Sequence, residues 1–346
     1  MMITLTFTMS YSSGNFKANP SQELAITYPP APLMILAGAG TGKTSTLIHR
    51  IIYQIQHYNA DPQSILAITY TEKAARELKE RIVSVIGQRA EKMTVSTFHA
   101  FCFNLVKDYR QSGASPILLE ESEASFLLLN RFNDLGPFES REFPRDPTKA
   151  VTESLIPFFN RTRDELIKPD KKRSDLKSLD SEICAQLADL KRIFPIFQQW
   201  KQSMNVVDYG DMILSAFELL NANSIVLDKV QSRFHHLIID EFQDNNFALN
   251  EIIGLIAKKR NQITVVGDED QVIYSFRGAS IHNIHLFRNQ YSGHKEYLEI
   301  ALEENFRSNQ EILDVANASI KNNVDRVEKS LQSFSGFSSK KPTLRR

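Results

Sequence analysis

This chain of 346 residues has few cysteines, no excess of charge of either sign and no long apolar run. Its two cysteines, Cys102 and Cys184, are too few for a disulfide framework or a four-thiolate metal cluster, and they suit a reducing cytosol. No apolar run approaches the roughly 18 residues that cross a bilayer, which argues against a membrane span. Lys plus Arg and Asp plus Glu both number 41, so the formal net charge is zero. Any contact with nucleic acid must therefore come from a local surface.

The length and the overall composition are those of an ordinary globular protein. Hydrophobic residues make up 42% and charged residues 24%, and 346 residues allow two or three domains with an ample core. The opening residues 1–9 are apolar but lack a basic n-region and a small-residue cleavage site, so we expect no signal peptide. We expect residues 1–16 to form a disordered leader and the protein to be cytoplasmic.

A glycine-rich stretch between an apolar run and a helical pattern carries the strongest signal. The run Leu33 to Leu36 has strand character, and helical spacing follows from Leu47. The turn between them reads Ala37-Gly38-Ala39-Gly40-Thr41-Gly42-Lys43-Thr44. Strand, glycine loop and helix form the context of a phosphate-binding loop, in which Lys43 reaches the β- and γ-phosphates and the Thr44 hydroxyl binds Mg²⁺. Ala37 stands where the general pattern has its first glycine, and a plain turn remains the alternative.

Further strands and helices alternate along the chain, with one interruption. This alternation predicts a parallel, doubly wound α/β sheet. Between about Leu105 and Lys201 the pattern is helical throughout, which is too long for one crossover and predicts an inserted helical subdomain. The runs that we interpret as strands are 33–36, 64–70, 93–96, 234–239, 262–266 and 296–301.

Acidic side chains follow two of these runs, at strand ends where ligands of open α/β sheets bind. Asp240 could hold Mg²⁺, largely through water, and Glu241 could deprotonate the attacking water. Gln271, after the neighbouring strand, could sense the γ-phosphate. Tyr274, Phe276 and Arg277 follow within a few residues. Such side chains could stack on bases, worth about 1–3 kcal/mol each, although an isolated aromatic such as Phe276 more often packs in a core.

Six motifs in this order resemble the N-terminal half of a superfamily 1 DNA helicase of the UvrD/Rep/PcrA type. Ala37 agrees with that family's own version of the loop, and the resemblance extends from about Asn19 to Asn322. The motifs are Ala37 to Thr44, Ala67 to Ala75, Thr97-Phe98-His99, Asp240 to Asp244, Val266 to Ala279 and Glu304-Asn305-Phe306-Arg307-Ser308.

The resemblance implies a RecA-like P-loop parallel sheet that is interrupted by a helical insertion and followed by the start of a second motor domain. Residues 17–104 and 201–300 would form the first RecA-like domain, residues 105–200 the insertion, and residues 301–346 the truncated start of the second domain. The family's second domain should continue beyond Arg346, so we expect this chain alone to hydrolyse ATP slowly or not at all.

The resemblance also assigns roles to individual residues. Gln22 would read adenine, Phe306 would stack on it, and Arg307 would contact the γ-phosphate alongside the catalytic residues Lys43, Asp240, Glu241 and Gln271. Ser45 adjoins the nucleotide where relatives often carry arginine. Val272 and Phe276 also depart from the usual Ser and Trp. The residues expected to face DNA are Thr71, Phe98, His99, Tyr274, Phe276 and Arg277.

The implied activity is ATP- and Mg²⁺-dependent movement, 3′→5′, on single-stranded DNA and duplex junctions, in repair, replication or recombination. The expected location is a bacterial-type nucleoid. Two alternatives stay open: a nucleotide-dependent DNA-binding or regulatory module, completed by a separate chain, and the helicase part of a recombination nuclease complex.

Overall fold

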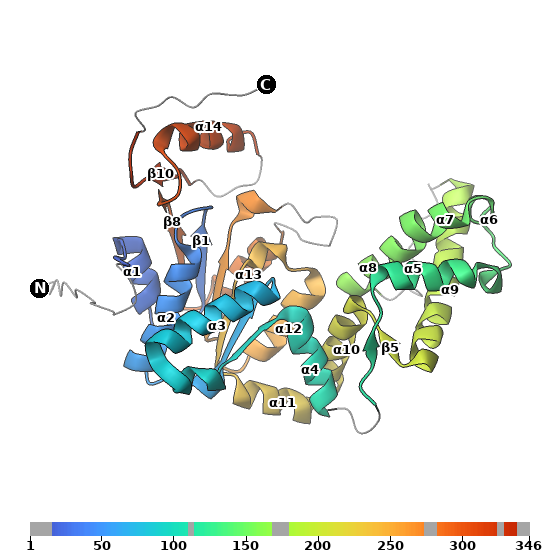
Figure 1. Ribbon diagram of the computed structural model, residues 1–346, viewed down its shortest axis with the longest axis horizontal. Helices are drawn as coiled ribbons and strands as arrows, with labels where there is room; N and C mark the ends of the chain where they lie inside the picture. The colour runs from blue at the N-terminus through green and yellow to red at the C-terminus, as the bar shows by residue number, and fades with distance from the viewer. Residues whose placement is uncertain (1–15, 110–113, 168–179, 273–281, 324–328, 338–346) are drawn as a thin grey trace, which may run out of the picture.

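Six parallel strands form the central sheet, in the order β3-β2-β6-β7-β1-β8 (Figure 1). The computed structural model describes residues 16–109, 114–167, 180–272, 282–323 and 329–337. The α/β class and the parallel sheet expected from the alternating pattern are confirmed. The strands of the sheet are β1 Leu33–Ala37, β2 Ile65–Thr69, β3 Thr94–Thr97, β6 His236–Ile239, β7 Ile263–Gly267 and β8 Leu298–Leu302.

Helices cover both faces of this sheet, because its inner strands are apolar on both sides. Alternate residues of one strand enter different cores: Leu33 and Ile35 of β1 pack on one face, Met34 and Leu36 on the other. The first face is covered by α1 Pro20–Thr27, α2 Lys43–His57 and α3 Glu72–Ile86. The second face is covered by α4 Phe98–Tyr109, α10 Tyr209–Ala222, α11 Ser224–Arg233, α12 Phe247–Ala257 and α13 His282–Tyr291.

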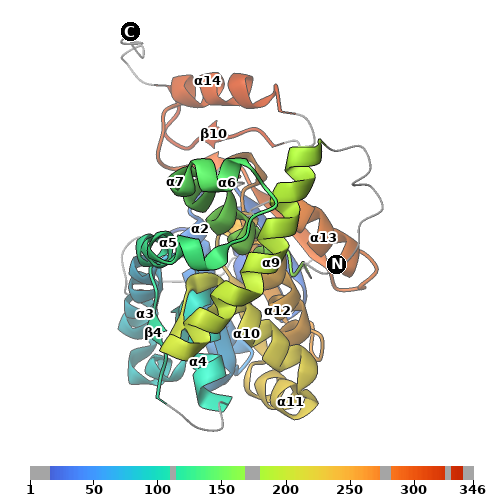
Figure 2. The same cartoon turned by 90° about the vertical axis from the view of Figure 1, so that its right-hand side faces the viewer.

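The helical insertion forms a separate body beside the sheet (Figures 1 and 2). It has its own core, in which Phe143, Phe159 and Phe197 are fully buried. A two-residue parallel pair, β4 Ile117–Leu118 with β5 Val206–Val207, joins the segments that lead into and out of the insertion. The sequence interpretation of 105–201 as wholly helical was wrong at β4, because a two-residue strand has no readable alternation. The helices are α5 Glu121–Asn130, α6 Glu142–Arg145, α7 Pro147–Lys149, α8 Ile156–Asp164 and α9 Ser181–Met204, with a π-helical turn over Ala150–Leu155.

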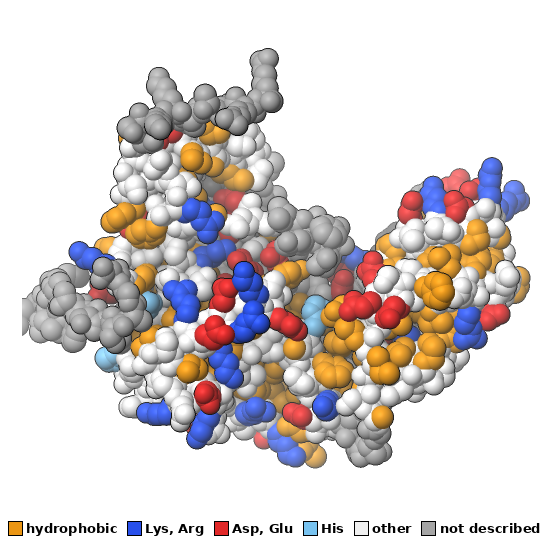
Figure 3. All heavy atoms as spheres, viewed as in Figure 1, with side chains coloured by type: hydrophobic (Ala, Val, Ile, Leu, Met, Phe, Trp, Pro, Cys, Tyr) orange, Lys and Arg blue, Asp and Glu red, His pale blue; other side chains and the backbone are white. Residues whose placement is uncertain are grey.

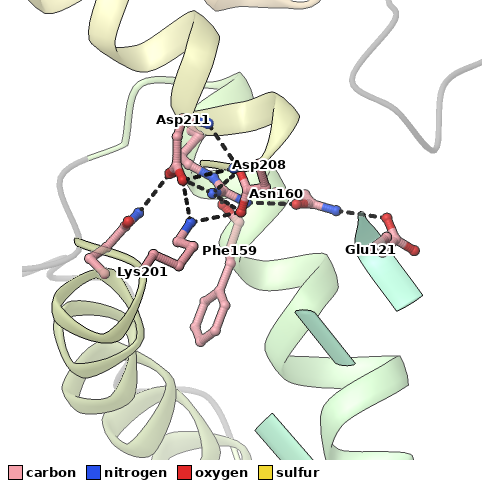
Figure 4. Close-up of polar contacts among 8 residues, drawn as sticks. Glu121, Phe159, Asn160, Lys201, Asp208 and Asp211 are labelled. Atoms are coloured by element: carbon pink, nitrogen blue, oxygen red, sulfur yellow. Dashed lines mark hydrogen bonds and ion pairs between the residues drawn. The ribbon is translucent and has the colours of Figure 1, made fainter. Parts of the chain in front are cut away.

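Four buried charged side chains, which we call the junction cluster, fasten the insertion to α10 (Figure 4). They are Arg163 of α8, Lys201 of α9, and Asp208 and Asp211 at the start of α10. Each cation contacts both carboxylates at 2.6–2.8 Å. Burial opposes the ionisation of Asp208, but Arg163 and Lys201 outweigh it and hold the pKa of Asp208 at about 2. Gly210 permits the contact, since a Cβ there would lie 2.6 Å from Arg163 Nε.

The segment after β8 lies above the carboxyl-terminal edge of the sheet (Figures 1 and 2). It contains β9 Glu304–Asn305, α14 Gln310–Ile320 and β10 Gln332–Ser333, with β9 and β10 paired in parallel. The start of a second motor domain at residue 301 stays a prediction, and β8 itself continues to Leu302. Short 3₁₀ turns complete the described chain: Pro62–Ser64, Gly87–Lys92, Phe132–Leu135, Phe242–Asp244 and Glu269–Gln271. Within the described residues, no helix has both the length and the apolar character needed to cross a membrane.

Replacing Lys201 by methionine should destabilise the protein by about 3–5 kcal/mol, because Asp208 and Asp211 would lose one of their two buried partners. The urea midpoint of unfolding measures the effect. Lys259→Met is the matched control, since Lys259 forms a solvent-exposed pair with Asp228 that is worth about 0–1 kcal/mol. Equal midpoints for the two variants would contradict the stabilising role of the junction cluster.

His236 should make stability depend on pH below neutrality. Burial lowers the pKa of His236 to about 4, and His235, Arg50 and Arg260 add to the effect. The unfolded chain therefore binds the proton first, so the contribution of His236 to stability is fully present above about pH 6.5 and falls toward pH 4, by on the order of 2–3 kcal/mol. Urea unfolding between pH 4 and 7 measures this slope. His236→Gln should flatten it, and an unchanged slope would assign the pH dependence to other groups.

Candidate nucleotide-binding site

The candidate site residues follow the carboxyl ends of neighbouring parallel strands, so they converge on one edge of the sheet. The glycine loop follows β1, Asp240 and Glu241 follow β6, and Gln271 follows β7. Because β1 and β6 both flank β7 in the sheet, the three loops are neighbours although nearly 200 residues separate the first from the second. The three loops that carry the candidate site residues therefore lie side by side.

The glycine loop has the backbone of an anion-binding turn. Gly40 and Gly42 have φ values of 79° and 82°, in the left-handed region that favours glycine. The loop carbonyl groups are already hydrogen-bonded: Gln22 Nε2 donates to Thr41 O at 3.0 Å, and the Phe306 amide donates to Gly40 O at 2.9 Å. Among the described residues, no acceptor is found for the amide N–H groups of Gly40, Gly42 and Lys43. With the N-terminus of α2, these donors fit a phosphate.

A continuous line of polar contacts joins the three loops. Lys43 Nζ lies 2.9 Å from Glu241 Oε2, and the same carboxylate oxygen accepts a hydrogen bond from Gln243 Nε2, also at 2.9 Å. Gln243 Oε1 in turn accepts from the Asp268 amide at 3.0 Å, and Gln271 Nε2 donates to Asp268 Oδ2. The structure thus brings Lys43, Glu241 and Gln271 into one network.

Glu241 has a backbone conformation that is unusual for its residue type. Its φ of 49° and ψ of 46° lie in the left-handed region, which costs an L-residue other than glycine roughly 1–2 kcal/mol. Such strain gathers at functional positions, where it fixes the direction of a side chain. At this position the Glu241 carboxylate meets Lys43.

Asp240 and Thr44 fit the expected magnesium site in their chemistry. Burial and the neighbouring Glu241 raise the pKa of Asp240 to about 6, against the opposing effect of Lys43, and a cation would favour its charged form. Thr44 is exposed at the start of α2. Among the described residues, no three His, Cys, Asp or Glu side chains gather to hold an ion. Mg²⁺ at this place would therefore rely on water and phosphate oxygens.

The residues expected around the base and the γ-phosphate also contact the loop. Gln22 is buried, and its Oε1 accepts from the Asn19 amide within the capping box of α1. Phe306 is 42% exposed, with its ring 5.2 Å from that of Phe334. Arg307 lies over the loop, since a Cβ on Gly40 would be 2.7 Å from its Cβ. No ion-pair partner for Arg307 occurs in the part of the chain that the structure describes.

The expected DNA contacts follow β2 and β3, at the same edge. Thr71 caps α3, with its hydroxyl accepting from the Ala74 amide, and the His99 ring lies 5.0 Å from that of Tyr209. Phe98 is only 6% exposed and packs in the sheet core, so its ring offers little surface to a nucleic acid. Tyr274, Phe276 and Arg277 lie outside the described residues.

Three polar residues of the site were missed from the sequence: Gln243, Asp268 and Asn305. Asn305 Nδ2 donates to Ala39 O, and its Oδ1 accepts from the Arg307 amide at 2.8 Å and the Ser308 amide at 2.7 Å. It therefore fixes the Arg307 turn against the glycine loop. All three lie inside motifs that the sequence marks, but they bind protein groups, and a motif alone does not separate such residues from those that would touch a ligand.

Ser45 has a neighbour that spacing could not reveal. Arg81 of α3 donates to Ser45 Oγ at 3.4 Å, and Ser45 O lies 2.7 Å from His49 Nδ1. A guanidinium from another helix therefore lies next to Ser45, at the start of α2.

Comparison with known proteins decides the family. Residues 18–292 match the family described as UvrD/REP helicase N-terminal domain. The chain belongs to this family. The family match includes the glycine loop and the loops after β6 and β7, so the network from Lys43 to Gln271 lies wholly inside it.

Individual relatives agree with this assignment. The chain is 33% identical over 319 residues to DNA helicase II of Haemophilus influenzae, covering 90% of this chain and 41% of the relative. It is 34% identical over 322 residues to ATP-dependent DNA helicase PcrA of Leuconostoc citreum, covering 92% of this chain and 41% of the relative. PcrA of Staphylococcus aureus strain Mu50 is 34% identical over 320 residues, with shares of 90% and 41%. The chain thus spans about two-fifths of the length of these relatives.

Gly40→Ala should loosen the segment 305–307 from the glycine loop. A Cβ at this position would lie 2.6 Å from Asn305 Nδ2, on a backbone with positive φ. Hydrogen exchange of the Phe306 amide, which bonds to Gly40 O, should become at least about tenfold faster, equivalent to about 1.4 kcal/mol of lost protection. Gly254→Ala in α12 is the control, because a Cβ there meets nothing within 4 Å. Unchanged exchange in Gly40→Ala would show that the contact with the loop does not hold this segment.

Proposed function

We propose that this chain is the ATP-binding part of a DNA helicase motor that couples ATP hydrolysis to movement on single-stranded DNA. The observation that carries the proposal is the contact between Lys43 after β1 and Glu241 after β6, within a network that reaches Gln271 after β7. The names of the relatives, DNA helicase II and ATP-dependent DNA helicase PcrA, support the same activity.

The residues of the site divide into binding and reacting groups. The amides of the glycine loop, the start of α2 and the Lys43 ammonium would hold the β- and γ-phosphates. Asp240 and Thr44 would hold Mg²⁺, which supplies charge neutralisation on the phosphate oxygens. Glu241 is the proposed base for the attacking water, and Gln271 and Arg307 would face the γ-phosphate.

In this scheme the Lys43–Glu241 ion pair has to open when nucleotide binds. Lys43 cannot remain fully paired with Glu241 while it neutralises phosphate, so binding would release the Glu241 carboxylate to accept a proton from water. The pair is half-buried, with side-chain exposures of 13% and 33%, which leaves it accessible for this exchange.

Single-stranded DNA is the proposed polymer, because Thr71 and His99 lie at the same edge as the nucleotide site. Base stacking tolerates any sequence and needs no net positive charge on the whole chain. The 3′→5′ direction, action at duplex junctions in repair, replication or recombination, a cytoplasmic nucleoid location, and slow turnover by this chain alone remain predictions from the sequence.

Lys43→Ala and Glu241→Gln should separate binding from hydrolysis. Lys43→Ala should weaken the binding of a fluorescent ATP analogue with Mg²⁺ by at least about tenfold, because the phosphates lose their buried cation. Glu241→Gln should leave the affinity within about threefold of wild type and, in a motor completed by the second domain, abolish hydrolysis in a single-turnover assay with single-stranded DNA.

Lys259→Ala serves as the matched control for this pair of variants. Lys259 pairs with Asp228 at the surface and precedes β7, at the edge of the sheet opposite the site, so both affinity and hydrolysis should stay at wild-type values. Wild-type protein that binds no ATP analogue in the presence of Mg²⁺ would refute the proposed function. Full hydrolysis by Glu241→Gln would instead refute the role of Glu241 as base.

A further inference from the structure

Lys329 is a buried cation from the segment after α14, and it lies among the acidic residues that follow β7. Its side chain is only 3% exposed, and its ammonium contacts Asp268 Oδ1, Asp270 Oδ2 at 3.2 Å and Glu269 Oε1 at 3.6 Å. No sequence motif that we identified includes Lys329. The contact joins positions 61 residues apart in the chain.

A buried turn that carries three neighbouring carboxylates needs a counter-charge. Asp268 and Glu269 are almost fully buried, with side-chain exposures of 4% and 1%. Burial alone would lower the pKa of Lys329, but the attraction of Asp268, Glu269 and Asp270 outweighs it and raises the pKa above its ordinary value. Lys329 therefore stays charged and balances this turn.

The turn that Lys329 balances is the one that orients Gln271. Asp268 uses Oδ1 for Lys329 and Oδ2 for the side-chain amide of Gln271. The Asp268 amide also donates to Gln243, which contacts Glu241. A change at Lys329 would thus affect Gln271 through Asp268. It would affect Glu241 through Asp268 and then Gln243.

We propose that Lys329 is a positioning residue for the γ-phosphate sensor: by pairing with Asp268, it holds Gln271 in place and makes recognition of the triphosphate depend on the docking of residues 329–337. This inference rests on the proposed function, since it assumes that Gln271 faces the γ-phosphate. It assigns to the segment after α14 a role in telling a nucleoside triphosphate from a diphosphate.

The ratio of ATP-analogue to ADP affinity tests this role. Lys329→Gln removes the charge but keeps hydrogen-bond donors, and the affinity for a non-hydrolysable ATP analogue with Mg²⁺ should fall by about tenfold or more. The affinity for ADP should stay within about twofold, because the contacts with the α- and β-phosphates do not involve Gln271. Lys329→Arg should restore most of the ratio. Titration of the full chain with fluorescent forms of both nucleotides gives the two constants.

Two further variants complete the experiment. Lys321→Met is the matched control, since Lys321 is an exposed lysine at the end of α14. The ratio of ATP-analogue to ADP affinity in this variant should equal that of wild type. If Lys329→Gln does not fold, as judged by urea unfolding, Asp268→Asn breaks the same contact from the other side and should lower the ratio in the same way.

The outcomes separate the inference from the proposed function. A folded variant that loses both nucleotides equally, or that keeps the wild-type ratio, would overturn the positioning role of Lys329. A wild-type chain that binds neither nucleotide would overturn the proposed function itself. A selective loss of the triphosphate in Lys329→Gln, with recovery in Lys329→Arg, supports the inference.

Discussion

The convergence of parallel strand ends on one edge of the sheet is the constraint on which the candidate site depends, and the ion pair between Lys43 and Glu241 lies at that edge. The pair joins the loops after β1 and β6, which are separated by 198 positions in the chain. The parallel sheet makes this pair possible, because parallel strands bring their carboxyl ends to one edge. The pair also requires that the insertion between β3 and β6 leaves this edge open. Three features therefore favour the contact between Lys43 and Glu241. They are the order of the strands in the sheet, the position of the insertion beside the sheet, and the left-handed backbone of Glu241.

Buried cations recur wherever segments that are distant in sequence meet. Arg50 of α2 is fully buried and donates to the carbonyl groups of Ala25 and Tyr28 and to the hydroxyl of Thr264 in β7. Arg163 and Lys201 join the insertion to α10, and Lys329 joins the segment after α14 to the turn after β7. A cation without partners is costly to bury, so each of these contacts selects one arrangement of its elements. The zero net charge of the chain therefore coexists with strong charge interactions in its interior.

The sequence predicted the features that depend on local pattern. The strands predicted at 33–36 and 262–266 were readable because they are short apolar runs, and the structure places them at 33–37 and 263–267. Lys43 and Glu241 were readable because each follows such a run. The pair β4–β5 was not readable, since two residues carry no period. Lys329 could not be assigned, because its partners lie across a tertiary contact and no motif contains it. The exposure of some apolar side chains was not readable either. Ile117 and Phe126 are 69% and 66% exposed, and hydrophobic side chains also gather on the surface of the insertion (Figure 3). Helical spacing alone would place such residues in a core. Pattern identifies the elements, and packing decides which side chains meet.

Asp208 is shared between two structures, since it caps the first turn of α10 and also binds Arg163 and Lys201. A movement of the insertion away from the sheet would therefore separate Arg163 and Lys201 from Asp208 and Asp211 and leave these charges without their buried partners. The insertion is consequently not a loosely tethered appendage. A displacement of the insertion should therefore also move α10, and through α10 the strands on which α10 packs.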